Sequence, residues 1–407
     1  MKLVPIFFLW HFVLAHWPLL AESDASCEIP YSRSSRVGWY EPTAPALPTI
    51  LTEVTQTGTA VSTIAGILAG LDVTLLSQGT RAYTTLEIAS CNDAALPDSG
   101  SLSWMDSPTQ LSVGHDLLQY HVGAVVGNWI LLTGITAGWS IVATQLGMAR
   151  ARIPGGLILP ILFLMGPTSS SAVTLLRDGT AVQKVLGGCS ITAQSMGLNM
   201  LSVFLSPAFF GAQWVRDGQE YAWADASEPN YVKHYGLLFS DYRGGRQFFV
   251  NAELLMSLAT GVLKSYQATQ TNCKDIVTAA AAVSLAYLAS LIVLRPHAEF
   301  KDRLFFTSIA ALESTALTMQ AISLWTGTEE SQSTTRTISE SIVMVAEWTL
   351  TIRTLYDVGR RIYGFYQRSR AVPVKKLALS RPTTPLKSMI LSIWLKSRLS
   401  VSIHKMI

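Results

Sequence analysis

The chain has 407 residues, of which 49% are hydrophobic and only 14% are charged, and its mean hydropathy is positive at +0.32. Soluble globular domains carry about 25% charged residues, so this composition excludes an ordinary soluble protein and indicates a membrane protein. The net charge of +3 is unevenly distributed. Residues 357–407 contain eleven Lys and Arg and a single acid, which predicts a basic cytoplasmic tail on an otherwise mildly acidic chain.

The first 23 residues are typical of a secretory signal peptide. Lys2 precedes an apolar stretch from Leu3 to Leu20, and the small residues Ala21 and Ser23 follow where cleavage would occur. We therefore predict a signal peptide over residues 1–23. The alternative is an uncleaved membrane anchor.

Residues 24–118 are rich in Ser, Thr, Pro and Gly and contain Cys27 and Cys91. After a signal peptide this segment would be extracellular or lumenal, where cysteines can pair. Within it, residues 58–76 are apolar enough to suggest a membrane span. Asp72 and the many Ser, Thr and Gly favour instead a helix that packs on the lumenal side.

Seven later stretches are helical in pattern and of membrane length. A helix of about 20 apolar residues crosses about 30 Å of hydrocarbon. The sequence therefore predicts an all-α membrane protein with a bundle of about seven transmembrane helices over residues 119–356. The seven predicted spans are residues 120–146, 155–176, 185–211, 247–264, 275–294, 304–325 and 338–356.

The loops between these spans predict the orientation of the bundle. Short loops rich in Lys and Arg stay in the cytoplasm. The loops at 147–154, 212–246 and 295–303, together with the tail, hold twenty Lys and Arg, whereas the alternate loops hold four. We therefore expect the N-terminus outside or in the lumen and the C-terminus in the cytoplasm, in the plasma membrane or an endomembrane.

Small residues spaced four apart mark a packing face on the first predicted span. They are Gly123 and Gly127, followed by Gly134 and Gly138. Such pairs let helix backbones approach closely, either inside the bundle or between two copies of the chain. The loop at 212–246 is dense in Trp and Tyr, which predicts a position among the lipid headgroups, with a partner-binding surface as the alternative.

Three acids fall inside predicted spans: Glu253, Glu313 and Glu347. A charge at the bilayer centre costs about 2.5–3.5 kcal/mol, so such residues face the bundle interior, bind a proton or find a partner. One hypothesis is a cation or proton path that these carboxylates line together with Asn251, Gln194 and Asn199. The alternative is polar contact between helices without transport.

The four cysteines allow three pairings. In the predicted orientation Cys189 and Cys273 both lie toward the outside, so they can pair with each other alongside Cys27 and Cys91, or Cys91 can pair with Cys273. No cysteine or histidine spacing matches a metal site. No nucleophile motif and no phosphate-binding loop is found, so we expect neither an enzyme nor a cofactor.

The tail predicts the partners of the chain. Its basic residues lie beside the last span, where a basic cluster binds anionic lipids. Residues 357–387 have the composition of a proline-punctuated linker, and the last twenty residues are typical of a helix on the membrane surface. Membrane lipids, another copy of the chain or a surface partner are therefore expected, and nucleic acid is not.

Three short motifs occur in a recognisable order. LSWMDSP is followed by GAVVGNWILL, and then by a lone Cys273 before a span that ends in LIVLRPHAEFKDRLFF. This order resembles the multi-pass C-terminal region of large protist surface proteins, such as the dispersed gene family proteins of trypanosomes, over about residues 55–330. The resemblance implies a surface protein acting in adhesion, interaction or sensing. The alternative function is a cation or proton channel or transporter that uses the buried acids.

Overall fold

The computed structural model describes residues 73–89, 102–147 without 103–104, 115 and 117, 152–206 without 154, 209–266 without 218–219 and 227–228, and 273–378 without 328. All of these lie in the second of the two units of the chain, Leu47–Ile407. The predicted signal peptide, Cys27, Cys91, most of the segment 58–76 and the predicted surface helix at the C-terminus lie outside the described residues.

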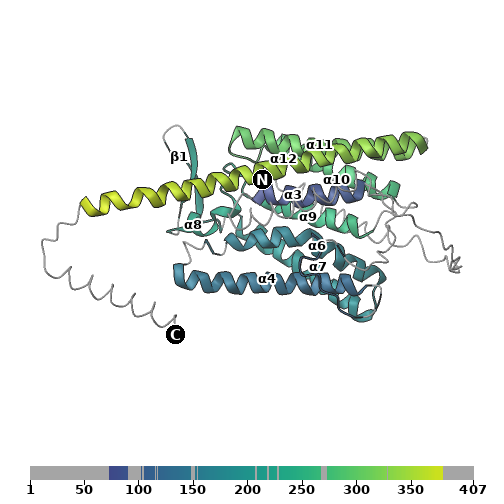
Figure 1. The fold of residues 1–407 in the computed structure, drawn as a ribbon, viewed down its shortest axis with the longest axis horizontal. Coiled ribbons are helices and arrows are strands. Elements are labelled where there is room, and N and C mark those ends of the chain that lie inside the picture. The colour runs from purple at the N-terminus through teal and green to yellow at the C-terminus, as the bar shows by residue number, and fades with distance from the viewer. Residues whose placement is uncertain are drawn as a thin grey trace. The chain divides into compact units, whose positions relative to one another are not determined.

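The described part is mostly helical, and a helix occurs at each of the seven predicted positions (Figure 1). By length and composition three of them can cross a membrane: Gln119–Gln145, Gly155–Asp178 and Cys273–Leu294. The seven helices are α4 (Gln119–Leu146), α6 (Ile158–Asp178, preceded by the short helix η1, Gly155–Leu157), α7 (Ala181–Phe204), α9 (Phe249–Ser265), α10 (Cys273–Leu294), α11 (Phe300–Thr326) and α12 (Glu329–Ala378).

One further long helix, α3 (Val73–Ala89), lies in the middle of the bundle. It contacts α6 and α9 on one side and α10, α11 and α12 on the other (Figure 1). These residues belong to the segment 24–118, which was predicted to lie outside the bundle. Hydropathy did not reveal α3 because its sequence, VTLLSQGTRAYTTLEIA, is less apolar than those of the predicted spans.

α3 runs from one end of the bundle to the other. Near its start, Thr74 Oγ1 lies 3.0 Å from the hydroxyl of Tyr242. At its end, Ile88 and Ala89 pack against Cys273 and Ile276 at the start of α10. Its 17 residues rise about 25 Å, which is close to the thickness of a bilayer core.

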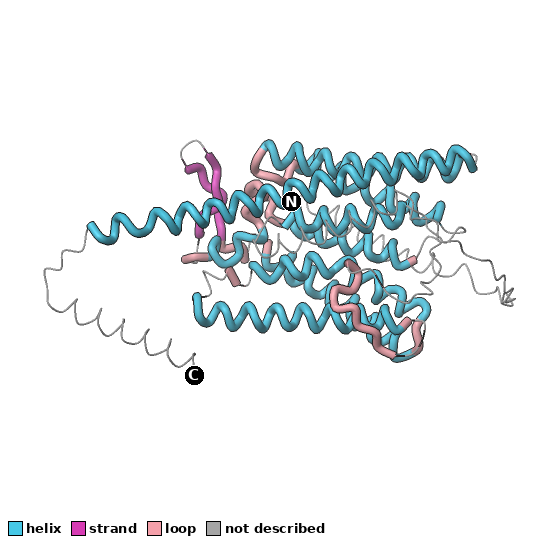
Figure 2. The backbone as a smooth tube through the Cα atoms, in the orientation of Figure 1, coloured by secondary structure: helices cyan, strands magenta, loops and turns pink. Residues whose placement is uncertain are grey.

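The fold departs from an all-α architecture in the loop predicted at the headgroups. The strands β1 (Ala212–Asp217) and β2 (Glu220–Asp225) form an antiparallel hairpin, followed by α8 (Tyr231–Tyr235) and η2 (Gly236–Leu238). Trp223 packs edge-on against Phe210 and Phe239, with ring centroids 5.4 and 5.2 Å apart. The hairpin and its neighbouring loops lie together at one end of the bundle, which we call the hairpin end (Figure 2).

The last helix is longer than predicted. α12 extends from Glu329 to Ala378 and continues past the hairpin end of the bundle (Figure 1). Residues 357–378 of the predicted linker (357–387) are therefore helical. Of the three prolines in the predicted linker only Pro373 falls within α12, and the Lys and Arg of this stretch are good helix formers.

Candidate functional site

Four side chains from four helices meet in the centre of the bundle. Arg81 of α3 places its Nε 3.0 Å from Glu313 Oε2 of α11 and its Nη1 3.6 Å from Glu253 Oε2 of α9. The guanidinium carbon lies 4.1 Å from the ring centroid of Tyr287 of α10. We call Arg81, Glu253, Glu313 and Tyr287 the central cluster. At most 1% of each of its charged side chains is exposed, so its charges are fully removed from solvent.

Glu253 is the most completely bonded acid of the central cluster. Tyr287 donates its hydroxyl to Oε1 at 2.5 Å, and Ser77 donates to Oε2 at 3.0 Å. Gln78 in turn donates to the Tyr287 hydroxyl at 3.3 Å. These bonds hold the Glu253 carboxylate in one orientation toward Arg81.

Several polar atoms of the central cluster make no hydrogen bond within the described part of the chain. They are both terminal nitrogens of Arg81 and Oε1 of Glu313. Buried polar atoms normally find a partner, because an unpaired one costs about 1–3 kcal/mol. Glu313 Oε1 could therefore bind a proton, and the Arg81 nitrogens could donate to a water molecule or another small polar species.

A second group of charges lies near the C-terminal end of α3, away from the hairpin end of the bundle. Lys264 of α9 forms ion pairs with Glu87 of α3 and, at 2.5 Å, with Asp106. Tyr83 donates to Glu87 at 2.7 Å. We call Lys264, Glu87 and Asp106 the peripheral cluster, because its side chains are 10–29% exposed.

Glu347 of α12 lies within electrostatic range of both clusters. Its side chain is 1% exposed, and the charges that act on it are those of Glu87 and Glu313. Neither of its carboxyl oxygens has a hydrogen-bond partner among the described residues. Glu347 is thus a buried acid for which the described part of the chain provides no compensating base.

Among the described residues, the fully buried acids of the bundle outnumber the bases beside them. The central cluster has two acids around one base, and Glu347 adds a third acid for which the described residues supply no base. Uncompensated charge is costly in a low-dielectric interior. A proton on one of these acids would lower that cost.

The structure brings together some of the predicted path residues and separates others. Glu253 and Glu313 share Arg81, as described above. Asn251 points to another face of α9, where it donates to Ser202 of α7 at 3.0 Å. Gln194 is buried on α7 and Asn199 is exposed there, and the main helix contacts of α7 are with α4, α6 and α9.

Sequence reasoning missed Arg81, the residue that organises the central cluster. The available signal was an arginine within a Ser- and Thr-rich stretch directly after the apolar segment 58–76. Thr80 and Thr84 donate their hydroxyls to the carbonyls of Ser77 and Thr80. This local bonding lets so polar a helix be buried.

The cysteines are arranged differently from one of the predicted pairings. Cys189 is free and exposed, whereas Cys273 is in a disulfide. The Cys189–Cys273 pairing is therefore not present, because Cys189 faces outward from α7. The partner of Cys273 lies outside the described residues.

The predicted glycine face of α4 has two different halves. A Cβ at Gly123 would overlap the carbonyl oxygen of Leu111, and one at Gly127 would overlap the hydroxyl of Thr109. The segment before α4 thus packs directly on these two glycines, in the place where a second helix was predicted. Gly134 and Gly138 have open space around them.

The fold and these clusters define a mostly helical protein whose apolar helices are suited to a membrane and enclose a buried charge network. Within the described residues, no group of three or more His, Cys, Asp or Glu could hold a metal ion. Comparisons of the chain with protein-family models, with curated proteins and with solved structures found no match.

Proposed function

We propose that the protein moves protons across a membrane and that Glu253, Glu313 and Glu347 bind them. The observation that supports this is the excess of buried acids over bases among the described residues of the bundle. A proton needs a single oxygen atom, whereas a metal cation needs several oxygen ligands. Glu347, whose two carboxyl oxygens have no hydrogen-bond partner within the described part of the chain, offers the first kind of site.

The arrangement along α3 suggests a route. Thr74 lies at the hairpin end beside Tyr242, the central cluster follows about one to two turns later, and Glu87 leads to the solvent-accessible peripheral cluster. Hydroxyl and carboxyl groups in sequence can pass a proton between them.

Flux measurements on the purified full chain in liposomes test this proposal. With an internal pH-sensitive dye and an imposed membrane potential, we expect proton entry above that of empty liposomes. Glu347→Gln and Glu313→Gln should each lower the rate at least about tenfold, which corresponds to roughly 1.4 kcal/mol.

A matched control lies on the same helix as Glu347. Glu340 pairs with Arg336 one turn away, and both are partly exposed, so Glu340→Gln removes one acid from α12 without touching the interior. Its flux should equal that of the wild type. Absence of flux in the wild type, or equal rates in all variants, would overturn the proposal.

The orientation and the partners remain proposals of their own. The charge distribution of the loops supports a cytoplasmic hairpin end, and the basic tail supports contact with anionic lipids. A surface role in adhesion, interaction or sensing rests on the motif resemblance alone. No observation among the described residues favours that role over transport.

A further inference from the structure

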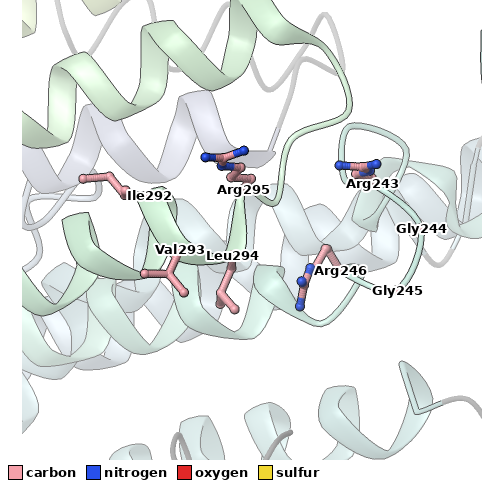
Figure 3. A pocket seen from close by; sticks show the side chains of 8 residues that line it. All are labelled: Arg243, Gly244, Gly245, Arg246, Ile292, Val293, Leu294 and Arg295. Carbon is pink, nitrogen blue, oxygen red and sulfur yellow. The ribbon is translucent and has the colours of Figure 1, made fainter.

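An open pocket of about 840 Å³ lies at the hairpin end, apart from both charge clusters. One wall is the turn formed by Arg243, Gly244, Gly245 and Arg246, and the other is the end of α10 with Arg295 (Figure 3). The remaining lining residues are Ile292, Val293 and Leu294. We propose that this pocket binds a phosphate group and that its occupant is the headgroup of an anionic membrane lipid.

The turn has a defined geometry. The backbone N–H of Arg246 donates to the carbonyl of Arg243 at 2.9 Å, and Gly245 adopts a φ of 76°, a conformation that favours glycine. A Cβ at Gly244 would overlap the ring of Trp214. Both glycines are therefore required for this turn to sit where it does.

The turn is also attached to the other wall of the pocket. The N–H of Arg243 donates to the carbonyl of Pro296 at 2.6 Å, and Tyr242 forms a β-bridge with His297. Arg295 has a φ of 46°, which is uncommon for a residue with a side chain. The backbone thus holds arginines from two distant segments around one opening before any ligand is present.

The pocket is positively charged. Arg243, Arg246 and Arg295 form no ion pair within the described part of the chain, and no acid is among the lining residues. Guanidinium groups bind phosphate through paired hydrogen bonds, which are among the stronger polar contacts in proteins. Three of them around one opening favour a phosphate ligand over a neutral one.

The apolar residues of the pocket favour a lipid over free phosphate. Ile292 and Val293 are 51% and 75% exposed, on the last turn of a helix that is apolar enough to cross a membrane. Their side chains would contact acyl chains where the hydrocarbon meets the headgroups. The hairpin end is predicted to face the cytoplasm, and anionic lipids are concentrated in the cytoplasmic leaflet.

Binding to the detergent-purified full chain can be measured by native mass spectrometry with three probes. They are a short-chain phosphatidic acid, phosphatidylcholine of the same chain length, and glycerol 3-phosphate. We expect phosphatidic acid to bind at least about tenfold more tightly than either of the others. Equal binding of both lipids would overturn the proposal, and equal binding of glycerol 3-phosphate would overturn the lipid as occupant.

Substitutions locate the site. Arg243→Gln with Arg295→Gln should weaken phosphatidic acid binding at least about tenfold, whereas Arg152→Gln with Lys233→Gln removes the same charge from the same end and should leave it unchanged. Equal losses in both double variants would show unspecific charge attraction and overturn the site. Arg243→Lys with Arg295→Lys keeps the charge but not the planar fork, and should give an intermediate affinity.

Discussion

Arg81 and Glu347 are buried to the same extent but differ in their bonding. Arg81 contacts acids from two other helices, and its Nε donates to Glu313 Oε2 at 3.0 Å, so the loss of Glu313 leaves a buried donor without its acceptor. Glu347 has no base and no hydrogen-bond partner among the described residues. The contacts of Arg81 therefore hold three helices together, whereas the burial of Glu347 lowers the free energy of unfolding.

This difference gives opposite stability effects for two equivalent substitutions. Glu347→Leu should raise the free energy of unfolding by roughly 1–3 kcal/mol, because it removes an unsatisfied buried carboxyl group. Glu313→Leu should lower it by roughly 1–3 kcal/mol, because the buried Nε of Arg81 loses its acceptor while Glu253 still compensates the charge. Thermal unfolding in detergent, followed by tryptophan fluorescence, measures both, and a less stable Glu347→Leu would contradict this account.

His297, in the connection between α10 and α11, gives the protein a pH-dependent stability. It is fully buried against the ring of Phe306, with centroids 4.7 Å apart, and neither ring nitrogen has a hydrogen-bond partner within the described residues. Burial, with a smaller contribution from the charge of Arg303, lowers its pKa from 6.5 to about 3. The folded protein therefore holds His297 in the neutral form at neutral pH.

The sign of the effect follows from proton binding. Between pH 6.5 and about 3 the unfolded chain binds a proton at His297 that the folded chain does not, so stability falls as the pH decreases through this window. The loss is about 1.4 kcal/mol per pH unit. His297→Phe should remove this contribution, and unfolding temperatures at pH 7.5 and 5.5 should differ less than in the wild type. An unchanged difference would contradict the assignment.

At the scale of elements, α4 shows that one sequence pattern can serve two purposes. Gly123 and Gly127 accommodate the segment around Thr109 and Leu111, which crosses the helix at close range. Asn128, the residue after Gly127, donates its side-chain N–H to the backbone carbonyl of Asp106 at 3.3 Å. The start of α4 is thereby joined to the segment that carries an acid of the peripheral cluster.

Alanine substitutions separate the two halves of α4. Gly123→Ala should destabilise the protein, because the added Cβ would overlap backbone that cannot rotate away. Gly134→Ala meets open space and should stabilise the helix by roughly 0.5–1 kcal/mol through lower backbone entropy in the unfolded chain. Unfolding temperatures of the two variants should shift in opposite directions. Equal losses would instead indicate that Gly134 contacts another chain.

At the scale of the whole molecule, α3 changes the predicted bundle of spans into a bundle around a polar central helix. Three of the predicted spans each place one side chain against Arg81 of α3: Glu253 from α9, Tyr287 from α10 and Glu313 from α11. Removing α3 would leave these acids facing one another. The helix is therefore part of the bundle and not an accessory to it.

The orientation of the bundle can be tested with single added cysteines in a Cys189→Ser background, whose own labelling is subtracted because it retains Cys27, Cys91 and Cys273. Ser240 lies at the hairpin end and Ser333 lies near the start of α12 at the other end, and both are exposed. On intact cells a membrane-impermeant maleimide should label Ser333→Cys, and Ser240→Cys only after permeabilisation. The reverse pattern would overturn the charge-based orientation.

The sequence by itself determined where the long helices form. Apolar stretches of membrane length and the charged loops between them are local properties, so both ends of α4, α6, α9, α10 and α11 were predicted within a few residues. The prediction was less accurate for α7, which ends at Phe204 and not at residue 211, and for α12, which is much longer than the predicted 338–356. The buried acids were also predicted, since charge inside an apolar stretch is visible without coordinates. All three are indeed buried.

Only the tertiary structure decided what these acids contact. Arg81 lies more than 170 residues from Glu253, and its helix is too polar to show a buried face in the sequence. Pairing between distant residues depends on how helices pack, which composition and periodicity do not encode. The same reason explains why Cys189 is free, why Asn251 stands apart, and why three arginines from two segments surround one pocket.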